Sequence, residues 1–200
     1  MITRPRTTLT LLCLLALTSL TLGGCRRVPP AEQNGTAPAT PGDSGQNQVP
    51  EYYRFLSEPG VAVESMDSIR AQLPYDSIYL RRDPCFGTCP TYEATLYRDG
   101  RARYSGERFV ERVGKYRGEV QLQDYGRLSY LMDRLGFMAL PDSFSVPYTD
   151  LPSATLAAYR RPEGLKSVHD YGYVGPVELW TMMEVFDRIV DRIQWEKTGP

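Results

Sequence analysis

The 200-residue sequence has a single histidine, His169, and no nucleophile elbow or cluster of metal-ligating side chains. These absences exclude the usual histidine-based hydrolytic sites and leave only carboxylates for acid–base catalysis. Asp150 and Asp170 are candidates because they lie in or beside expected loops. Asp150, in "TDLP", is more typical of an aspartate that bonds its own loop backbone. The sequence therefore predicts a protein that is not an enzyme.

An excess of positive charge is also missing, since 23 basic residues stand against 24 acidic ones and the formal net charge is −1. Proteins that bind nucleic acid normally concentrate positive charge, so a nucleic-acid partner is not expected. After residue 25 there is no apolar run long enough to cross a bilayer. What the chain does have is tyrosine, and several of its 14 tyrosines could line a recognition surface, namely Tyr92, Tyr104, Tyr116, Tyr148, Tyr171 and Tyr173.

The N-terminus has the pattern of a secretory signal. Arg4 and Arg6 precede an apolar run at 9–22 that is short for a membrane span. The run ends in "LGGC", which resembles the lipobox of bacterial lipoproteins, so residues 1–24 are expected to be removed and Cys25 to receive lipid. Two hydrophobic anchors on Cys25 would give stable membrane attachment. The alternative is a soluble secreted protein that is cut nearby by the ordinary signal peptidase.

Residues 25–50 are rich in proline, glycine and small polar residues, and they have no periodic apolar pattern. They are expected to form a disordered linker that reaches about 25 to 30 Å from the membrane. Arg26 follows Cys25 in place of the aspartate that retains many lipoproteins at the inner membrane. We therefore expect the bacterial cell envelope, with the protein on the outer membrane and facing the periplasm. Removal of Arg4 and Arg6 leaves 21 basic and 24 acidic residues, a formal charge of −3.

The remaining chain predicts one folded domain at 77–195, preceded by an extension at 51–76 and followed by a tail at 196–200. In the extension, Ser65 could cap a short helix. Alternating patterns predict strands at 77–82, 91–97, 101–106 and 108–120, the last one broken near Gly114. The turn at "RDG" is expected to be a three-residue loop with Gly100 in the left-handed region. Only that loop places the apolar residues of both strands on one face, by pairing Leu96 with Ala102 and Ala94 with Tyr104.

Helical spacing predicts a helix at 124–135 that ends at Gly136, and a second helix after Pro176. The second helix has a buried stripe formed by Leu179, Met182, Met183, Phe186, Ile189, Val190 and Ile193. Between the two helices, "ATLAAYR" and "GLKSVHDY" predict a hairpin. This order indicates an α+β fold, in which an antiparallel sheet of about five to six strands has two helices packed on one face.

Cys85 and Cys89 are the two cysteines that would remain as thiols after export and lipidation. In an oxidising compartment they are expected to form a disulfide, which closes a short loop and contributes about 2 kcal/mol. A thioredoxin-like redox couple normally has two intervening residues and a helix after the motif. A Cu(I) site made of Cys85, Cys89 and His169 is the sharper alternative, because "CFGTCP" resembles the motif of copper chaperones for cytochrome oxidase assembly. Those chaperones also place a helix after the motif, whereas 91–106 predicts a hairpin, so the disulfide is preferred.

Several segments together resemble the bacterial domain-of-unknown-function family 6438, over about 77–195: "LRRDPCFGTCPTYEATLYRDGRARYSG", "GKYRG", "LMDRLGF", "YTDLPSATL" and "VHDYGY". The resemblance implies a compact envelope domain, often found on lipoproteins, with no assigned reaction. We expect no cofactor, with copper as the alternative. We therefore expect a lipid-anchored envelope protein with a non-enzymatic binding or structural role, whose partner is an envelope protein or a cell-wall component. The alternative is a periplasmic copper-binding or thiol–disulfide redox protein.

Overall fold

The computed structural model describes residues 65–200. The predicted signal peptide, the lipidation site Cys25, the linker and residues 51–64 of the extension lie outside the described residues. Within 65–200, no helix combines the length and the apolar character that a bilayer span needs.

One sheet of eight strands forms the centre of the domain, in the order β5-β7-β6-β1-β2-β3-β4-β8. Neighbouring strands are antiparallel except β5 and β7, which are parallel. The strands are β1 (Ser77–Arg82), β2 (Thr91–Tyr97), β3 (Arg101–Arg108), β4 (Gly114–Glu119), β5 (Ser143–Phe144), β6 (Ser153–Arg160), β7 (Gly164–Tyr171) and β8 (Trp195–Gly199).

The α+β class is confirmed, but the prediction of a purely antiparallel sheet with five to six strands is wrong. The two unpredicted strands are β5 and β8, and β8 occupies most of the expected tail at 196–200. Neither strand has an alternating pattern, because β5 has two residues and β8 reads "WEKTG". Each forms because an edge strand, β7 or β4, offers backbone groups to pair with.

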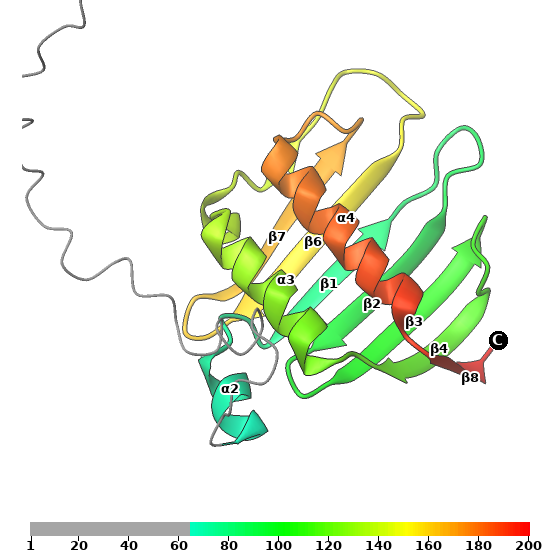
Figure 1. The fold of residues 1–200 in the computed structure, drawn as a ribbon. Coiled ribbons are helices and arrows are strands. Elements are labelled where there is room, and N and C mark those ends of the chain that lie inside the picture. The colour runs from blue at the N-terminus through cyan, green and yellow to red at the C-terminus, as the bar shows by residue number, and fades with distance from the viewer. Residues whose placement is uncertain (1–64) are drawn as a thin grey trace, which may run out of the picture. The chain divides into compact units, whose positions relative to one another are not determined.

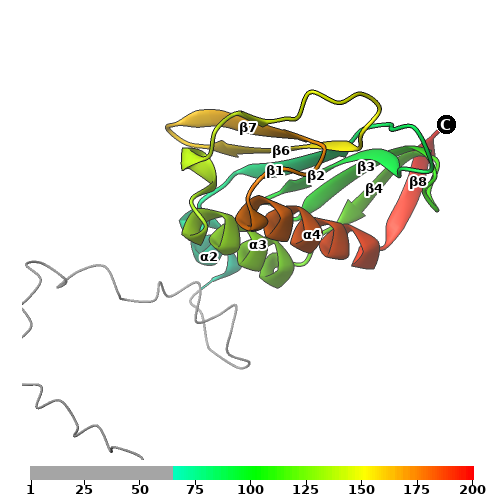
Figure 2. The same cartoon turned by 90° about the horizontal axis from the view of Figure 1, so that it is seen from above.

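Three α-helices accompany the sheet in the described part: α2 (Met66–Gln72), α3 (Leu122–Arg134) and α4 (Val177–Arg192). Helices α3 and α4 lie side by side and cover one face of the sheet, as Figures 1 and 2 show. The third, α2, begins where the sequence suggested, since the Ser65 side chain accepts a hydrogen bond from the Ser68 N–H at 3.0 Å. A one-turn 3-10 helix, η1 (Phe137–Ala139), follows α3 after Gly136, which has a left-handed conformation.

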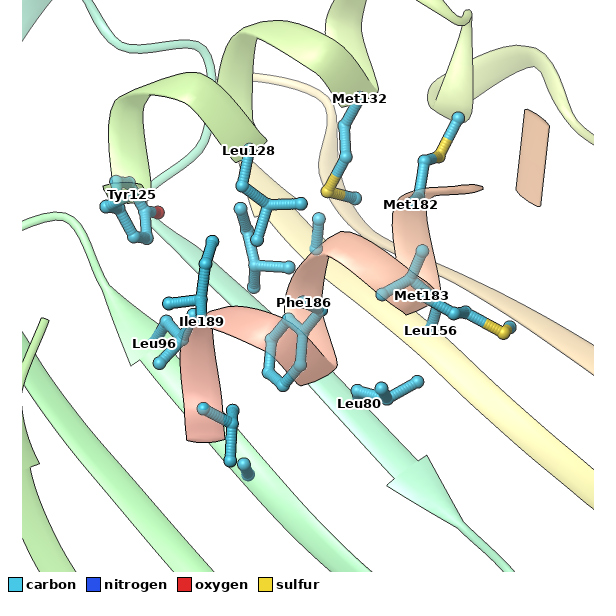
Figure 3. Packing of buried hydrophobic residues seen from close by; sticks show 14 of the residues in the cluster. Leu80, Leu96, Tyr125, Leu128, Met132, Leu156, Met182, Met183, Phe186 and Ile189 are labelled. Carbon is cyan, nitrogen blue, oxygen red and sulfur yellow. The ribbon is translucent and has the colours of Figure 1, made fainter. Parts of the chain in front are cut away.

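The core lies between the two long helices and the sheet. All seven residues of the predicted stripe on α4 are buried. Figure 3 shows Phe186 and Ile189 of α4, Leu128 of α3, and Leu80 and Leu96 of the sheet in this layer. Burial of a large apolar side chain is worth about 1.5 to 3 kcal/mol, so this stripe fixes the position of α4 on the sheet.

The β2–β3 hairpin has the predicted register. Leu96 pairs with Ala102 and Ala94 with Tyr104, and Gly100 has a positive φ of 96°. The structure differs after residue 106, because β3 continues to Arg108 and residues 109–113 form a loop before β4. This loop folds back closely over Gly106, where an added Cβ would lie 1.9 Å from the carbonyl oxygen of Arg112. Only glycine permits that approach.

Candidate functional site

Four loops lie along one end of the sheet. In this antiparallel arrangement, strands β1, β3 and β7 end at the same side where β2, β4 and β6 begin. We call the loop end residues 83–90, 109–113, 145–152 and 172–176 together with the first turn of α4 (Figure 1). Eight of the eleven exposed large hydrophobic side chains of the described chain belong to it: Phe86, Phe109, Val113, Tyr148, Tyr173, Val174, Val177 and Trp180. Gathering of exposed apolar side chains in one region is typical of an interaction surface.

The disulfide between Cys85 and Cys89 closes a small ring in the first of these loops, with the two Cα atoms 5.7 Å apart. The ring presents Phe86, which is 89% exposed. The ring is also tied to the third loop, since the Phe86 N–H donates to the carbonyl of Asp150 at 3.1 Å. The Asp83 N–H donates to the carbonyl of Ser153 at 3.0 Å. Phe86 is therefore held on a braced loop and not on a free one.

Backbone strain is concentrated in the same loops. The three non-glycine residues of the described chain with positive φ are Phe109 at 56°, Asp150 at 66° and Tyr173 at 54°. Each such residue costs about 1 kcal/mol or more, and such residues cluster at functional sites. The prediction for the Asp150 side chain is wrong: within 65–200 its carboxylate makes no hydrogen bond, and the loop uses its carbonyl instead. Aspartate tolerates the left-handed conformation better than most residues.

Asp170, the other carboxylate that the sequence suggested, is fully buried near the end of β7. One oxygen accepts the N–H groups of Val174 and Gly175, each at 3.0 Å. The other accepts the indole N–H of Trp180 at 2.9 Å. Asp170 thus joins β7, the fourth loop and the start of α4, which is a structural role.

A second carboxylate, the half-buried Asp187 of α4, was not expected from the sequence. Its Oδ2 accepts from both Nε and a terminal nitrogen of Arg82, the former at 3.0 Å, and its Oδ1 accepts from the Tyr92 hydroxyl. The other terminal nitrogen of Arg82 donates to the hydroxyl of Tyr173 at 3.1 Å. Asp187 lies at the border of the apolar stripe of α4, and a carboxylate at such a position is normally expected to face the solvent. Only the tertiary structure brings Arg82 and Tyr92 to it.

Burial dominates the electrostatics of this network. Burial raises the pKa of Asp187, and the charge of Arg82 and the hydrogen bonds from Arg82 and Tyr92 oppose that rise. Burial alone would lower the pKa of Arg82, but the charge and hydrogen bonds of Asp187 raise it above its usual value. Burial and the nearby Asp187 charge also raise the pKa of Tyr92. Arg82 and Tyr92 therefore remain proton donors at neutral pH.

A cavity of about 260 Å³ lies beside this network, between β2, β3, the second loop and α4. Its lining includes Tyr92, Tyr104, Phe109, Arg112, Asp187 and Asp191. The rings of Tyr92 and Tyr104 stack with centroids 5.3 Å apart. Tyr104 is 6% exposed. Burial raises the pKa of Tyr104 to about 12, so the hydroxyl is neutral at physiological pH.

The tyrosines that the sequence suggested for recognition divide into three groups. Tyr92 and Tyr104 line the cavity, and Tyr148 and Tyr173 are exposed at the loop end. Tyr116 and Tyr171 are half-buried. The high number of tyrosines is visible in the sequence. Which of them lie together at the loop end depends on the fold.

The arrangement does not fit the Cu(I) site of Cys85, Cys89 and His169. The two sulfur atoms are bonded to each other and so are not thiolates. His169 lies on β7, where its Nδ1 is 3.0 Å from the Oγ1 of Thr155. Within residues 65–200, no three His, Cys, Asp or Glu side chains are grouped so that they could hold a metal ion. The copper and redox hypotheses stay predictions that would first require reduction of the disulfide.

The double variant Cys85→Ser/Cys89→Ser is expected to have a free energy of unfolding about 2 kcal/mol lower, because it removes a short-range cross-link. Urea unfolding of the variant and of the parent chain measures the difference. Reduction of the parent chain should give the same loss, which separates the bond from the effect of the serine side chains. Titration of the native, unreduced chain that found the Cys85 and Cys89 thiols free would contradict the disulfide.

Comparison with protein-family models matches residues 76–190 to one family, described as Domain of unknown function (DUF6438). The match covers more than half of the chain and includes the disulfide ring, the Arg82–Asp187–Tyr92 network and most of α4. A search of the curated proteins finds no match. On the strength of the family match, the chain belongs to the DUF6438 family.

Proposed function

We propose that this protein is a non-enzymatic, lipid-anchored protein of the bacterial cell envelope that binds another protein through the loop end. One observation carries the proposal: most exposed large hydrophobic side chains of the described chain gather on four neighbouring loops. The disulfide and the hydrogen bonds between the loops hold these side chains in place before binding. Such preorganisation reduces the entropy that a binding surface loses when the complex forms.

The chemistry of Asp170 and Asp187 supports binding over catalysis. Asp170 is inaccessible, and both of its oxygens already accept hydrogen bonds. Asp187 is held by Arg82 and Tyr92. Carboxylates committed to fixed donors in this way are suited to positioning loops, and acid–base catalysis needs a group that can exchange a proton with a substrate.

The location on the outer membrane, facing the periplasm, is proposed from the sequence alone, through the lipobox at Cys25 and the residue that follows it. The linker at 25–50 would let the domain search a volume near the membrane surface. A rigid hydrophobic surface on a lipid-anchored chain suits a partner that is itself fixed in the envelope. The proposed partner is therefore an envelope protein.

Site-specific photocrosslinking of the full chain in cells tests this proposal. A photoreactive residue at position 86 is expected to capture a discrete protein, because Phe86 is the most exposed large hydrophobic side chain of the loop end. The matched control is position 165, since Leu165 is 71% exposed but lies on the β6–β7 hairpin at the opposite end of β7. Adducts at both positions alike, or adducts with peptidoglycan in place of protein at position 86, would contradict the proposal.

A further inference from the structure

We infer that the cavity beside the Arg82–Asp187–Tyr92 network receives an arginine or lysine side chain of the protein partner. This inference rests on the proposed function and specifies the chemistry of the partner. It follows from three properties of the described residues: the balance of charge around the cavity, its aromatic walls and its size.

The charges that line the cavity leave one carboxylate without a partner. Arg82 and Asp187 neutralise each other. Arg112 lies 3.5 Å from Glu111, which also lines the cavity. Asp191, one helical turn after Asp187, is exposed and has no ion pair in the described part of the chain. A ligand group with one positive charge would therefore balance the cavity.

The wider surface has the same sign. Asp150 in the third loop and Glu178 at the start of α4 are exposed, and neither forms an ion pair within residues 65–200. Both carboxylates belong to the loop end. Complementary charge steers association and selects partners, so a basic protein surface is favoured over an acidic one. An anionic bilayer surface is disfavoured for the same reason.

The walls of the cavity are also suited to a cation. Faces of aromatic rings attract guanidinium groups. Phe109 provides such a face at the rim, where the guanidinium of Arg108 already lies 5.9 Å from the ring centre. The Tyr104 hydroxyl can accept a hydrogen bond from an N–H donor. Phe109 is 54% exposed and has a left-handed backbone, so the loop holds its ring at the rim against a conformational cost.

The size of the cavity indicates a side chain. At about 260 Å³ it is below the roughly 300 to 1,000 Å³ of sites for small molecules, yet it is large enough for one long side chain. Energetically dominant contacts at protein interfaces are often an arginine or aromatic side chain in a pocket, surrounded by weaker contacts. In this arrangement the exposed side chains of the loop end supply the surrounding contacts.

The test is a titration of the ¹⁵N-labelled full chain in detergent with small probes, followed by NMR. N-acetylarginine methylamide is expected to shift the amide signals of Tyr104, Phe109 and Asp191. Its affinity should be about five-fold higher than that of N-acetylnorleucine methylamide, the uncharged analogue, because one exposed charge contact is worth about 1 kcal/mol. Asp191→Asn should weaken binding of the arginine probe by about five-fold, while Glu184→Gln, on the solvent side of the same helix, should leave it unchanged.

Equal binding of the two probes, tighter binding of N-acetylglutamate methylamide, or no effect of Asp191→Asn would overturn the inference. Binding of the same surface to vesicles of phosphatidylethanolamine and phosphatidylglycerol would overturn the assignment to a protein side chain. These results are separable from the proposed function. Photocrosslinks at position 86 without probe binding in the cavity would support the proposed protein partner and contradict only the inference that its basic side chain enters the cavity.

Discussion

Replacement of Asp170 by alanine is expected to lower the free energy of unfolding by about 4 kcal/mol. The change leaves three donors without an acceptor, the buried N–H of Gly175 and the part-buried Val174 N–H and Trp180 indole N–H. Each buried polar group that loses its partner costs about 1 to 3 kcal/mol. The N-terminus of α4 also loses a negative charge that interacts well with the helix dipole. Urea unfolding followed by tryptophan fluorescence measures the loss.

Two further variants make this result specific. Asp170→Asn keeps one acceptor oxygen but turns an N–H₂ group toward the Trp180 indole, so an intermediate loss of about 2 kcal/mol is expected. Glu178→Ala removes an exposed carboxylate from the first turn of the same helix and should cost no more than about 0.5 to 1 kcal/mol. A free energy of unfolding for Asp170→Ala within 1 kcal/mol of that of the parent chain would contradict this prediction. The Asp170 carboxylate would then not stabilise the start of α4 as its hydrogen bonds indicate.

The parts of the fold that the sequence predicted are those whose pattern repeats locally. The register of the β2–β3 hairpin followed from the requirement that Leu96, Ala94 and their partners share one face. The buried face of α4 followed from helical spacing, and the pair of Glu184 and Arg188 was found on its solvent side at 3.1 Å. In each case the feature is determined by residues that are close together in the sequence, so no knowledge of the tertiary structure is needed to predict it.

Features that depend on distant residues were not predicted. Strand β8 has no apolar alternation and is a strand because β4 pairs with it. Asp187 is separated by 105 residues from Arg82 and by 95 from Tyr92, and nothing in the sequence of α4 distinguishes it from a surface carboxylate. The loop end is likewise assembled from four separate segments. Asp170 was found from the sequence, but as a candidate catalyst, because its burial depends on how α4 and the fourth loop fold over it.

Asp170 and the half-buried Asp187 perform related tasks at the loop end. Asp170 attaches the fourth loop to the start of α4, and Asp187 attaches the middle of α4 to Arg82 at the end of β1 and to Tyr92 of β2. The disulfide ring connects β1 to β2. The position of the exposed aromatic side chains therefore depends on polar contacts behind them. A binding surface on loops needs such support, because loops without it are mobile.

Replacement of Asp187 by alanine is the second change for which we expect a large effect, a loss of about 3 to 4 kcal/mol in the free energy of unfolding. The Arg82 and Asp187 side chains are only 16% and 21% exposed. Removal of the carboxylate leaves the Arg82 charge and the Tyr92 hydroxyl unpaired in a poorly solvated place, and breaking a buried ion pair from one side costs about 3 to 5 kcal/mol. Urea unfolding of Asp187→Ala, of the singles Asp187→Leu and Arg82→Met, and of the double variant Arg82→Met/Asp187→Leu provides the measurement.

The double variant should recover more than half of the loss, because two apolar side chains of similar volume carry no desolvation cost. The exposed pair on the same helix supplies the control, since Arg188 and Glu184 are 72% and 60% exposed and their double alanine variant should lose less than about 1 kcal/mol. The coupling energy between Arg82 and Asp187 then shows whether the two side chains stabilise the fold together or independently. A value near zero would mean that Asp187 stabilises α4 independently of Arg82, whereas a coupling of about 2 kcal/mol or more would show that helix and sheet are joined through this pair.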